Sequence, residues 1–441
     1  MLLSIDSTRF LIFMISVVSL IYEGLEIALE IKQQKKPLPA AVSEIYDVER
    51  YRRFIAHEGE TRRLSLMETA ISYVLQFIVL FSPAFGLIEN MTGGNVYLTA
   101  IVTYFIYMLL GQLTELPGEY YHTFVIDTRY GLNRRTKREF WKDEWLSLIQ
   151  DAFTTLGILL LFAFCGEHIG RWTNGYSVGL WKAAMIGLAM IVAIMVFVFI
   201  AALVSYVLLK KKYAFTPLPD GELRNQIVAL MQGCKKKVSQ IYVYDESKKT
   251  TGKNAFLLKL LWHREFGIAD NFMNENDERE LLAVLSHEIG HLKHKKNFLD
   301  FVQYFIICAT IILIVLLIHN PSPVLALNAW TRESFQICAN NYYILLSVYS
   351  SILTPILFAT RCFGNYRSRR NEYEADMEAV HNGFGEELIS TFEKLSSDEL
   401  IDVNPHPLIE WLEYDHPGMY RRITVIRAAE AKKEAEMHAG V

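Results

Sequence analysis

The chain has 441 residues, a formal net charge of −4, and a hydrophobic fraction of 52% in which glycine is not counted. Soluble globular chains reach only about 45–50% with glycine included, so this composition indicates a membrane protein. The small net charge argues against a nucleic-acid partner, and the five scattered cysteines lack the paired spacing of a zinc finger or a redox site. Any metal is therefore expected to be held by nitrogen and oxygen ligands.

Seven apolar stretches are long enough to cross a bilayer as helices. They are residues 9–28, 66–88, 97–117, 148–168, 178–209, 298–319 and 342–362. The first resembles a signal peptide, but no small-residue cleavage site follows it, so we expect it to be retained. We therefore predict an all-α integral membrane protein with seven transmembrane helices.

The spans divide the chain into four predicted domains. These are 1–209 with spans one to five, 210–297 as a first polar segment, 298–362 with spans six and seven, and 363–441 as a second polar segment. The loops at 29–65 and 118–147 are rich in lysine and arginine, whereas 89–96 has neither. By the positive-inside rule, the basic loops and both polar segments face the cytosol, and the N-terminus faces the lumen.

The first polar segment contains the motif HEIGH at His287–His291, in a predicted helix for which Asn274 or Asn276 is the expected N-cap. Residues four apart share a helical face, so both imidazoles can bind one ion. Catalytic Zn²⁺ takes three protein ligands and a water, and Glu288 is placed to remove a proton from that water. The alternative is an exposed helix with two unrelated histidines.

The second polar segment offers a third ligand directly after the seventh span. Glu372 and Asp376 are four apart and share one predicted helical face. Glu372 can complete a His, His, Glu set, and Asp376 can either orient a ligand imidazole or donate a proton. Arg369 and Arg370 are expected to balance these carboxylates, and Glu374 is expected to point elsewhere. The alternative is an ordinary charged helix beside the membrane.

The motif at His287–His291, the stretch Ser368–Asp376 and the seven-span layout together resemble the type 1 CAAX prenyl proteases. The stretch Phe124–Asp127 with Gly131–Asn133 is similar to that family's FVxE…GFN loop, with aspartate in place of glutamate. The resemblance implies a zinc endopeptidase of the endoplasmic reticulum membrane. It also implies one Zn²⁺ per chain and a prenylated, for example farnesylated, CAAX protein as the substrate.

The stretch Val243–Lys248, which leads to Asn254 and Ala255, is similar to the strand that precedes the zinc helix in that family. A short sheet is accordingly expected around 239–270. The resemblance implies that Asn254 and Ala255 bind the substrate backbone by edge pairing, which is an established mode of peptide recognition.

Near the C-terminus, the chain from Asp415 to Arg422 is similar to the family's SHPxxxER segment. By position, His416 would stabilise the oxyanion of the tetrahedral intermediate. Either Arg421 or Arg422 would bind the C-terminal carboxylate of the substrate or the transition state, and the spacing favours Arg422. Three positions depart from that segment, because Asp415 replaces serine, Gly418 replaces proline and Arg421 replaces glutamate.

The predicted function is removal of the C-terminal tripeptide from prenylated CAAX proteins by a gluzincin-like zinc domain that carries a short β-sheet. The expected zinc ligands are His287, His291 and Glu372, and the expected catalytic residues are Glu288, Asp376 and His416. The sequence leaves three alternatives open. They are a quality-control zinc protease that cleaves misfolded membrane proteins, an inactive zinc-binding scaffold, and a transporter, which would place polar residues in mid-span.

Overall fold

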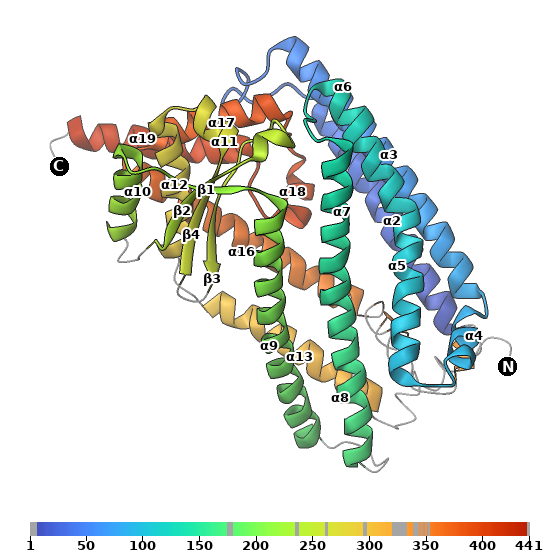
Figure 1. The fold of residues 1–441 in the computed structure, drawn as a ribbon. Helices are drawn as coiled ribbons and strands as arrows, with labels where there is room; N and C mark the ends of the chain where they lie inside the picture. The colour runs from blue at the N-terminus through green and yellow to red at the C-terminus, as the bar shows by residue number, and fades with distance from the viewer. Residues whose placement is uncertain are drawn as a thin grey trace.

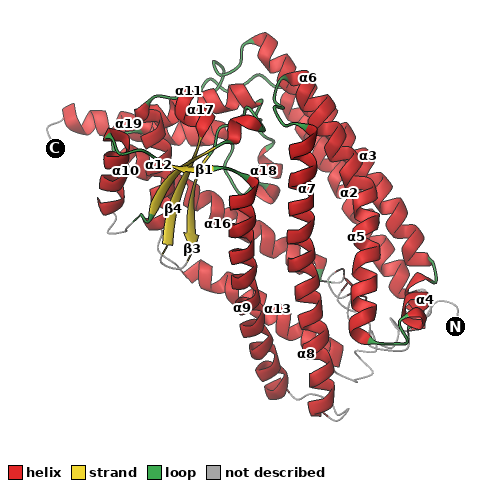
Figure 2. Ribbon diagram, in the orientation of Figure 1, coloured by secondary structure: helices red, strands yellow, loops and turns green. Residues whose placement is uncertain are grey.

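The computed structural model describes residues 7–173, 180–233, 238–260, 263–293, 298–319, 333–337, 344, 347–348, 351 and 353–438. Within these residues the protein is mostly helical, with one small sheet beside a group of long helices (Figure 1, Figure 2). The sheet and the C-terminal helices gather at one end of the long helices (Figure 1).

Long apolar helices dominate the first half of the chain. In order they are α2 Ser7–Gln34, α3 Val48–Phe81, α4 Ala84–Met91, α5 Val96–Tyr121, the π-helical turn η1 His122–Asp127, α6 Thr128–Tyr130, α7 Lys137–Asp151, the π-helical turn η2 Ala152–Leu156, α8 Gly157–Thr173, α9 Leu180–Lys212 and, later, α13 Phe298–His319. Helices α2, α3 and α5 lie side by side, and α8, α9 and α13 form a second group that contacts the first through α5 (Figure 1).

Five helices among the described residues are long and apolar enough to cross a membrane. They run over Arg9–Gln34, Val48–Phe81, Val96–Tyr130, Lys137–Phe164 and Ala184–Lys212. Large apolar side chains on them, such as Phe10, Leu109 and Val196, are exposed, and extended apolar surface of this kind marks a membrane contact. These helices match the first five predicted spans. Helix α13 coincides with the sixth, and the seventh is described only in part, at 344, 347–348, 351 and 353–362, so the count of seven stays a prediction.

The predicted sheet around 239–270 is present and has four strands. They are β1 Phe215–Pro217, β2 Gln240–Tyr244, β3 Ala255–Leu260 and β4 His263–Ala269, in the spatial order β1-β2-β4-β3. Strands β2 and β4 are parallel, and the other two pairs are antiparallel. Strand β3 is therefore an edge strand, and no described strand pairs with its outer side.

Helices from both polar segments lie around this sheet. They are α10 Glu222–Gly233, the 3₁₀ turn η3 Glu246–Lys248, α11 Asp270–Glu275, α12 Glu278–Lys293, α16 Thr354–His381, α17 Gly385–Glu399, α18 Pro407–Glu413 and α19 Met419–His438. Helix α12 contributes to two hydrophobic cores. Its Leu281, Leu285 and Ile289 pack against the sheet and α10, and its Ala283 packs with α3, α16, α17 and α19. The helix that carries the histidine motif is thus fixed from both sides.

Candidate metal centre

Helix α12 begins after Asp277, whose side chain accepts a hydrogen bond from the Glu280 backbone N–H at 2.8 Å. Glu280 Oε2 in turn accepts from the Asp277 N–H at 3.4 Å, and this reciprocal pair satisfies two donors of the first turn. The prediction that Asn274 or Asn276 caps this helix is wrong. Asn274 lies in α11, and the Asn276 side chain donates to Glu280 Oε2.

Helices α12 and α16 approach each other closely where Gly290 faces Ala375. A Cβ added at Gly290 would lie 2.6 Å from the Ala375 Cα, so a glycine is required where the two backbones come so close. His291 follows Gly290, and Glu372 lies three residues before Ala375. The close approach therefore brings the histidines of α12 into contact with the carboxylates of α16.

Glu372 contacts both histidines of the motif. His287 Nε2 lies 3.4 Å from Glu372 Oε2, and His291 Nε2 lies 3.3 Å from Glu372 Oε1. A tetrahedral zinc with ligands at about 2.0–2.2 Å has neighbouring ligand atoms about 3.3–3.6 Å apart. These three side chains therefore fit a zinc ligand set. Glu288 belongs to the same group, because its carboxylate and the two imidazoles place ligand atoms within 4.8 Å of one another.

A buried ion pair lies behind His287. The Nδ1 atom of His287 is 2.9 Å from Asp376 Oδ1, so Nε2 is the nitrogen that faces Glu372. Arg422 donates from Nε and Nη2 to the two oxygens of Asp376, at 2.9 and 2.6 Å. Arg422 Nη1 lies 3.3 Å from Glu372 Oε2, and the guanidinium lies 4.2 Å from the centre of the Phe392 ring. One arginine therefore contacts both carboxylates of α16.

Burial and Arg422 together set the charge of the centre. Burial would raise the pKa of Asp376, but the charge and hydrogen bonds of Arg422 and His287 together outweigh it and hold that pKa below its ordinary value. Burial would also raise the pKa of Glu372. Hydrogen bonds from the two histidines and the charge of Arg422 outweigh burial and hold this pKa far below its ordinary value. Burial raises the pKa of Glu288. Glu288 is therefore, of the three carboxyl groups, the one best suited to bind a proton.

The prediction that Arg369 and Arg370 balance these carboxylates is wrong, because Arg422 does so. Arg369 is buried and donates to carbonyl groups at the C-terminal end of α18, including Glu410 O at 2.9 Å. Basic groups are favoured at that end of a helix. Arg370 lies 3.3 Å from Glu374, which is exposed. Arg369 thus anchors α18 to α16 instead of neutralising the centre.

Helix α18 leads into the loop that carries His416. His416 Nε2 lies 3.4 Å from Glu372 Oε1, although its side chain is 59% exposed. Its Nδ1 lies 2.8 Å from Asp415 Oδ1. The structure therefore brings His416 to the edge of the centre, and Asp415, which replaces the serine of the resembled segment, orients its ring.

The other two departures in this segment share one partner, the buried Glu410. The Gly418 N–H donates to Glu410 Oε1 at 3.1 Å, a bond that proline could not make. Arg421 donates from Nε to Glu410 Oε2 at 2.8 Å. A glutamate at position 421 would repel Glu410, so the departures form a consistent set.

Asn254 and Ala255 lie at the start of the edge strand β3, which packs beside α12. The Asn254 carbonyl accepts a hydrogen bond from the Ala269 N–H at 2.9 Å, and the Asn254 side chain is exposed. In the described part of the chain, neither residue makes a hydrogen bond or an ion pair with the histidines or Glu372. They lie outside the ligand set, on or beside a strand that packs against α12.

Two family descriptions match this chain. "CAAX prenyl protease N-terminal, five membrane helices" matches residues 28–204, and "Peptidase family M48" matches residues 217–430. The chain belongs to the CAAX prenyl protease group of peptidase family M48. The prediction of a membrane metallopeptidase is thereby confirmed, and the five membrane helices of the first description agree with the five found here.

Individual proteins give the same result. The CAAX prenyl protease 1 homolog of Oryza sativa subsp. japonica is 24% identical over 92% of this chain and 93% of that protein. The probable CAAX prenyl protease 1 of Schizosaccharomyces pombe is 24% identical over 91% of this chain and 84% of its own length. The crystal structure of S. mikatae Ste24p superposes with a TM-score of 0.80 at 21% identity and covers 95% of this chain and 99% of its own. This chain therefore has the Ste24p fold.

Proposed function

We propose that this protein is a zinc endopeptidase that removes the C-terminal tripeptide of prenylated CAAX proteins at the membrane. The observation that carries the proposal is the contact of Glu372 with both His287 and His291, in a chain that belongs to the CAAX prenyl protease group. The long apolar helices beside this centre support a substrate whose lipid group enters the bilayer.

His287, His291 and Glu372 would hold one Zn²⁺, with a fourth position left for water or substrate. Zinc, when bound, acts as a Lewis acid and makes water a nucleophile at neutral pH. Glu288 accepts a proton from the attacking water and passes it to the leaving amine. The position of its carboxylate beside both imidazoles supports this role.

Of the two roles that the sequence leaves open for Asp376, the contacts support orientation of His287. Both Asp376 oxygens already accept hydrogen bonds, from His287 and Arg422, and the side chain is fully buried. It is therefore not placed to pass a proton to a substrate. A carboxylate behind a ligand imidazole fixes its tautomer and strengthens it as a ligand. Arg422 fixes Asp376 in turn, and its Nη1, beside Glu372, is the part that could meet a substrate carboxylate or the transition state.

His416 is proposed to donate a hydrogen bond to the oxyanion of the tetrahedral intermediate. Its Nε2 is close to Glu372 and its ring is open to solvent, so a substrate carbonyl can reach it. In the imidazolium form, Nδ1 donates to the Asp415 carboxylate and Nε2 carries the proton that the oxyanion would accept. A donor aimed at a developing negative charge is among the largest contributions to catalysis.

The edge strand β3 is proposed to hold the substrate backbone. Its outer side can add an extended peptide as a further strand, beginning near Asn254 and Ala255. Because β3 packs beside α12, a peptide added there would run alongside the zinc helix.

The finer topology is part of the same proposal. The gluzincin-like zinc domain would consist of the segments 210–297 and 363–441, both on the cytosolic side of a protein with seven spans. Residues 1–209 and 298–362 would form the membrane region. The family and the basic loops support residence in the endoplasmic reticulum membrane, with the zinc domain and the C-terminus in the cytosol.

Mass spectrometry of a farnesylated CAAX peptide, incubated with the purified protein in lipid vesicles, tests the function. We expect loss of three C-terminal residues by wild-type protein and intact peptide with Glu288→Gln. Equal cleavage of unprenylated, misfolded membrane proteins would favour a quality-control protease. Folded, zinc-loaded protein that leaves every farnesylated peptide intact would overturn the proposal in favour of an inactive scaffold.

A further inference from the structure

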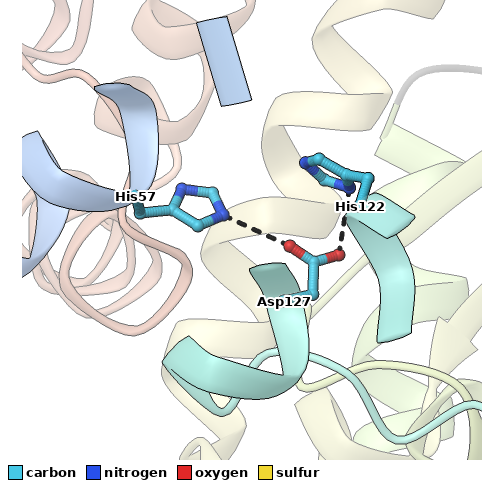
Figure 3. A group of neighbouring side chains, drawn as sticks. All are labelled: His57, His122 and Asp127. Carbon is cyan, nitrogen blue, oxygen red and sulfur yellow. Dashed lines mark hydrogen bonds and ion pairs between the residues drawn. The ribbon is translucent and has the colours of Figure 1, made fainter. Parts of the chain in front are cut away.

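A second cluster of histidines and a carboxylate lies at the end of the long helices, outside the centre described above. His57 projects from α3, and His122 and Asp127 come from the two ends of the π-helical turn η1 (Figure 3). His57 Nε2 lies 3.2 Å from Asp127 Oδ1, and His122 Nδ1 lies 3.4 Å from Asp127 Oδ2. The three residues can place ligand atoms within 4.8 Å of one another.

The π-helical turn is what brings two of these side chains together. In an α-helix, residues five apart point about 140° away from each other, because each residue advances the helix by about 100°. His122 and Asp127 are five residues apart. The wider π turn, whose backbone hydrogen bonds join residues five apart, brings these two side chains back toward one face. Such turns are rare and occur frequently at functional sites.

The chemistry of this cluster suits a divalent cation. Two imidazoles and one carboxylate form a nitrogen and oxygen donor set that zinc accepts. The side chains are partly sheltered, with exposed fractions of 12% for His57, 28% for His122 and 23% for Asp127. Glu68 and Glu119 lie close enough to His122 to act on its charge, so the surroundings add negative potential.

The distances are compatible with tetrahedral zinc. Neighbouring ligand atoms around zinc are about 3.3–3.6 Å apart, and the 3.2 and 3.4 Å separations, which run to the two different oxygens of Asp127, are close to this range. The Thr61 hydroxyl lies 3.3 Å from His122 Nε2, so Nδ1 is the nitrogen directed at Asp127. Orientation of a ligand imidazole through its second nitrogen is usual at metal sites.

We propose that His57, His122 and Asp127 form a second Zn²⁺ site, with a water at the fourth position. The ion joins α3 to the end of α5 and so fixes the loop that follows η1. This loop supports the segment before β3, because Leu132 N–H donates to Asp127 O at 2.8 Å and Thr251 N–H donates to Leu132 O at 3.2 Å. The second ion is therefore structural and lies outside the catalytic centre.

Zinc content of the full-length protein, purified in detergent without strong chelators, tests this proposal by mass spectrometry of the metal. We expect two Zn²⁺ per wild-type chain, one in His287→Ala/His291→Ala and one in His57→Ala/His122→Ala. The matched control His381→Ala/His438→Ala removes two histidines that are exposed and should retain two. Because each pair of substitutions removes one site, failure of this site and failure of the catalytic centre are distinguishable.

Two further measurements use milder changes. Asp127→Asn preserves the shape of the side chain and should lower the count in the His287→Ala/His291→Ala background from one to zero. In that background, added zinc should raise the melting temperature, and Asp127→Asn should abolish the rise. A single zinc in wild-type protein that is lost in His287→Ala/His291→Ala would overturn the proposal. The three residues would then be a hydrogen-bonded network in which the carboxylate accepts from both imidazoles.

Discussion

The two clusters of histidine and carboxylate side chains in this protein differ in the residues that hold their ligands in place. In the cluster of α12 and α16, Asp376 holds His287 from behind and is itself held by Arg422, with no exposure of the Asp376 side chain. In the cluster of α3 and η1, the described contacts of the Asp127 carboxylate are the two histidines and include no arginine.

This difference fits the roles that we propose, a catalytic centre for the first cluster and a structural ion for the second. In the buried cluster, the Asp376–Arg422 ion pair fixes the orientation of the His287 ring. Glu288 lies beside the two histidines and can accept and release a proton.

In the second cluster, the side-chain bonds among the described residues join the three ligands to one another and to Thr61. Glu68 and Glu119 act on His122 through their charge, and the geometry depends on a π turn. A catalytic site needs preorganised ligands supported by their neighbours, whereas a structural ion needs only compatible donors.

The largest effect is expected from a substitution that largely abolishes catalysis at the first cluster but leaves its zinc bound. Glu288→Gln should lower kcat for a farnesylated peptide by about 10²–10⁴-fold, because it removes the general base. Zinc content should remain unchanged, because Glu288 is outside the ligand set. Peptide cleavage followed by mass spectrometry, with metal analysis of the same sample, measures both. Full activity would contradict the assignment.

The next effect compares the same substitution at each cluster. Gly290→Ala forces a Cβ toward the Ala375 Cα, and overpacking of this kind costs about 1–3 kcal/mol. Gly59→Ala, on α3 two residues after His57, meets no atom within 4 Å and should leave stability unchanged or slightly raised. Thermal unfolding of both variants checks the contrast. Equal melting temperatures would mean that α12 and α16 are not in close contact.

A third experiment sharpens the comparison of the two carboxylates. Asp376→Asn should weaken zinc binding at the catalytic centre by about 10–100-fold, because a neutral amide orients His287 less well. Asp127→Asn should leave that affinity unaltered. Competition with a chromogenic chelator measures it, and an unchanged affinity in Asp376→Asn would show that the Asp376 carboxylate does not support His287.

The smallest effect is expected at Glu374, which is in the same helix as Glu372 and Asp376 but on its exposed side. Glu374→Gln weakens a surface pair with Arg370, and such pairs contribute about 0–1 kcal/mol. Activity and zinc content should equal those of wild-type protein within error. A loss of zinc in this variant would mean that the face of α16 has been assigned wrongly.

Local patterns explain what could be predicted from the sequence. Apolar runs and the spacing of two histidines on one helix depend on neighbouring residues, so the first five membrane helices and the histidine helix were predictable. The short sheet was also expected, although β1 lies outside the predicted range. The N-cap of α12 was predicted wrongly, because Asp277 and Glu280 form a reciprocal pair of hydrogen bonds that the nearby asparagines cannot replace.

Long-range contacts explain what could not be predicted. The pairing of Arg422 with Asp376 and its approach to His287 join residues 46 and 135 positions apart. Nothing in local spacing favours Arg422 over the nearer Arg369. The cluster of His57 with His122 and Asp127 was missed for the same reason and because a π turn cannot be read from an α-helical pattern. The one available signal was the aspartate in the stretch Phe124–Asp127.

Anomalous X-ray scattering at the zinc edge, on crystals of active protein, tests the central claim most directly. The account predicts a peak within bonding distance of His287 Nε2, His291 Nε2 and a Glu372 oxygen. A catalytically active crystal with no zinc at that position, or with the Glu372 carboxylate turned away from both imidazoles, would contradict it.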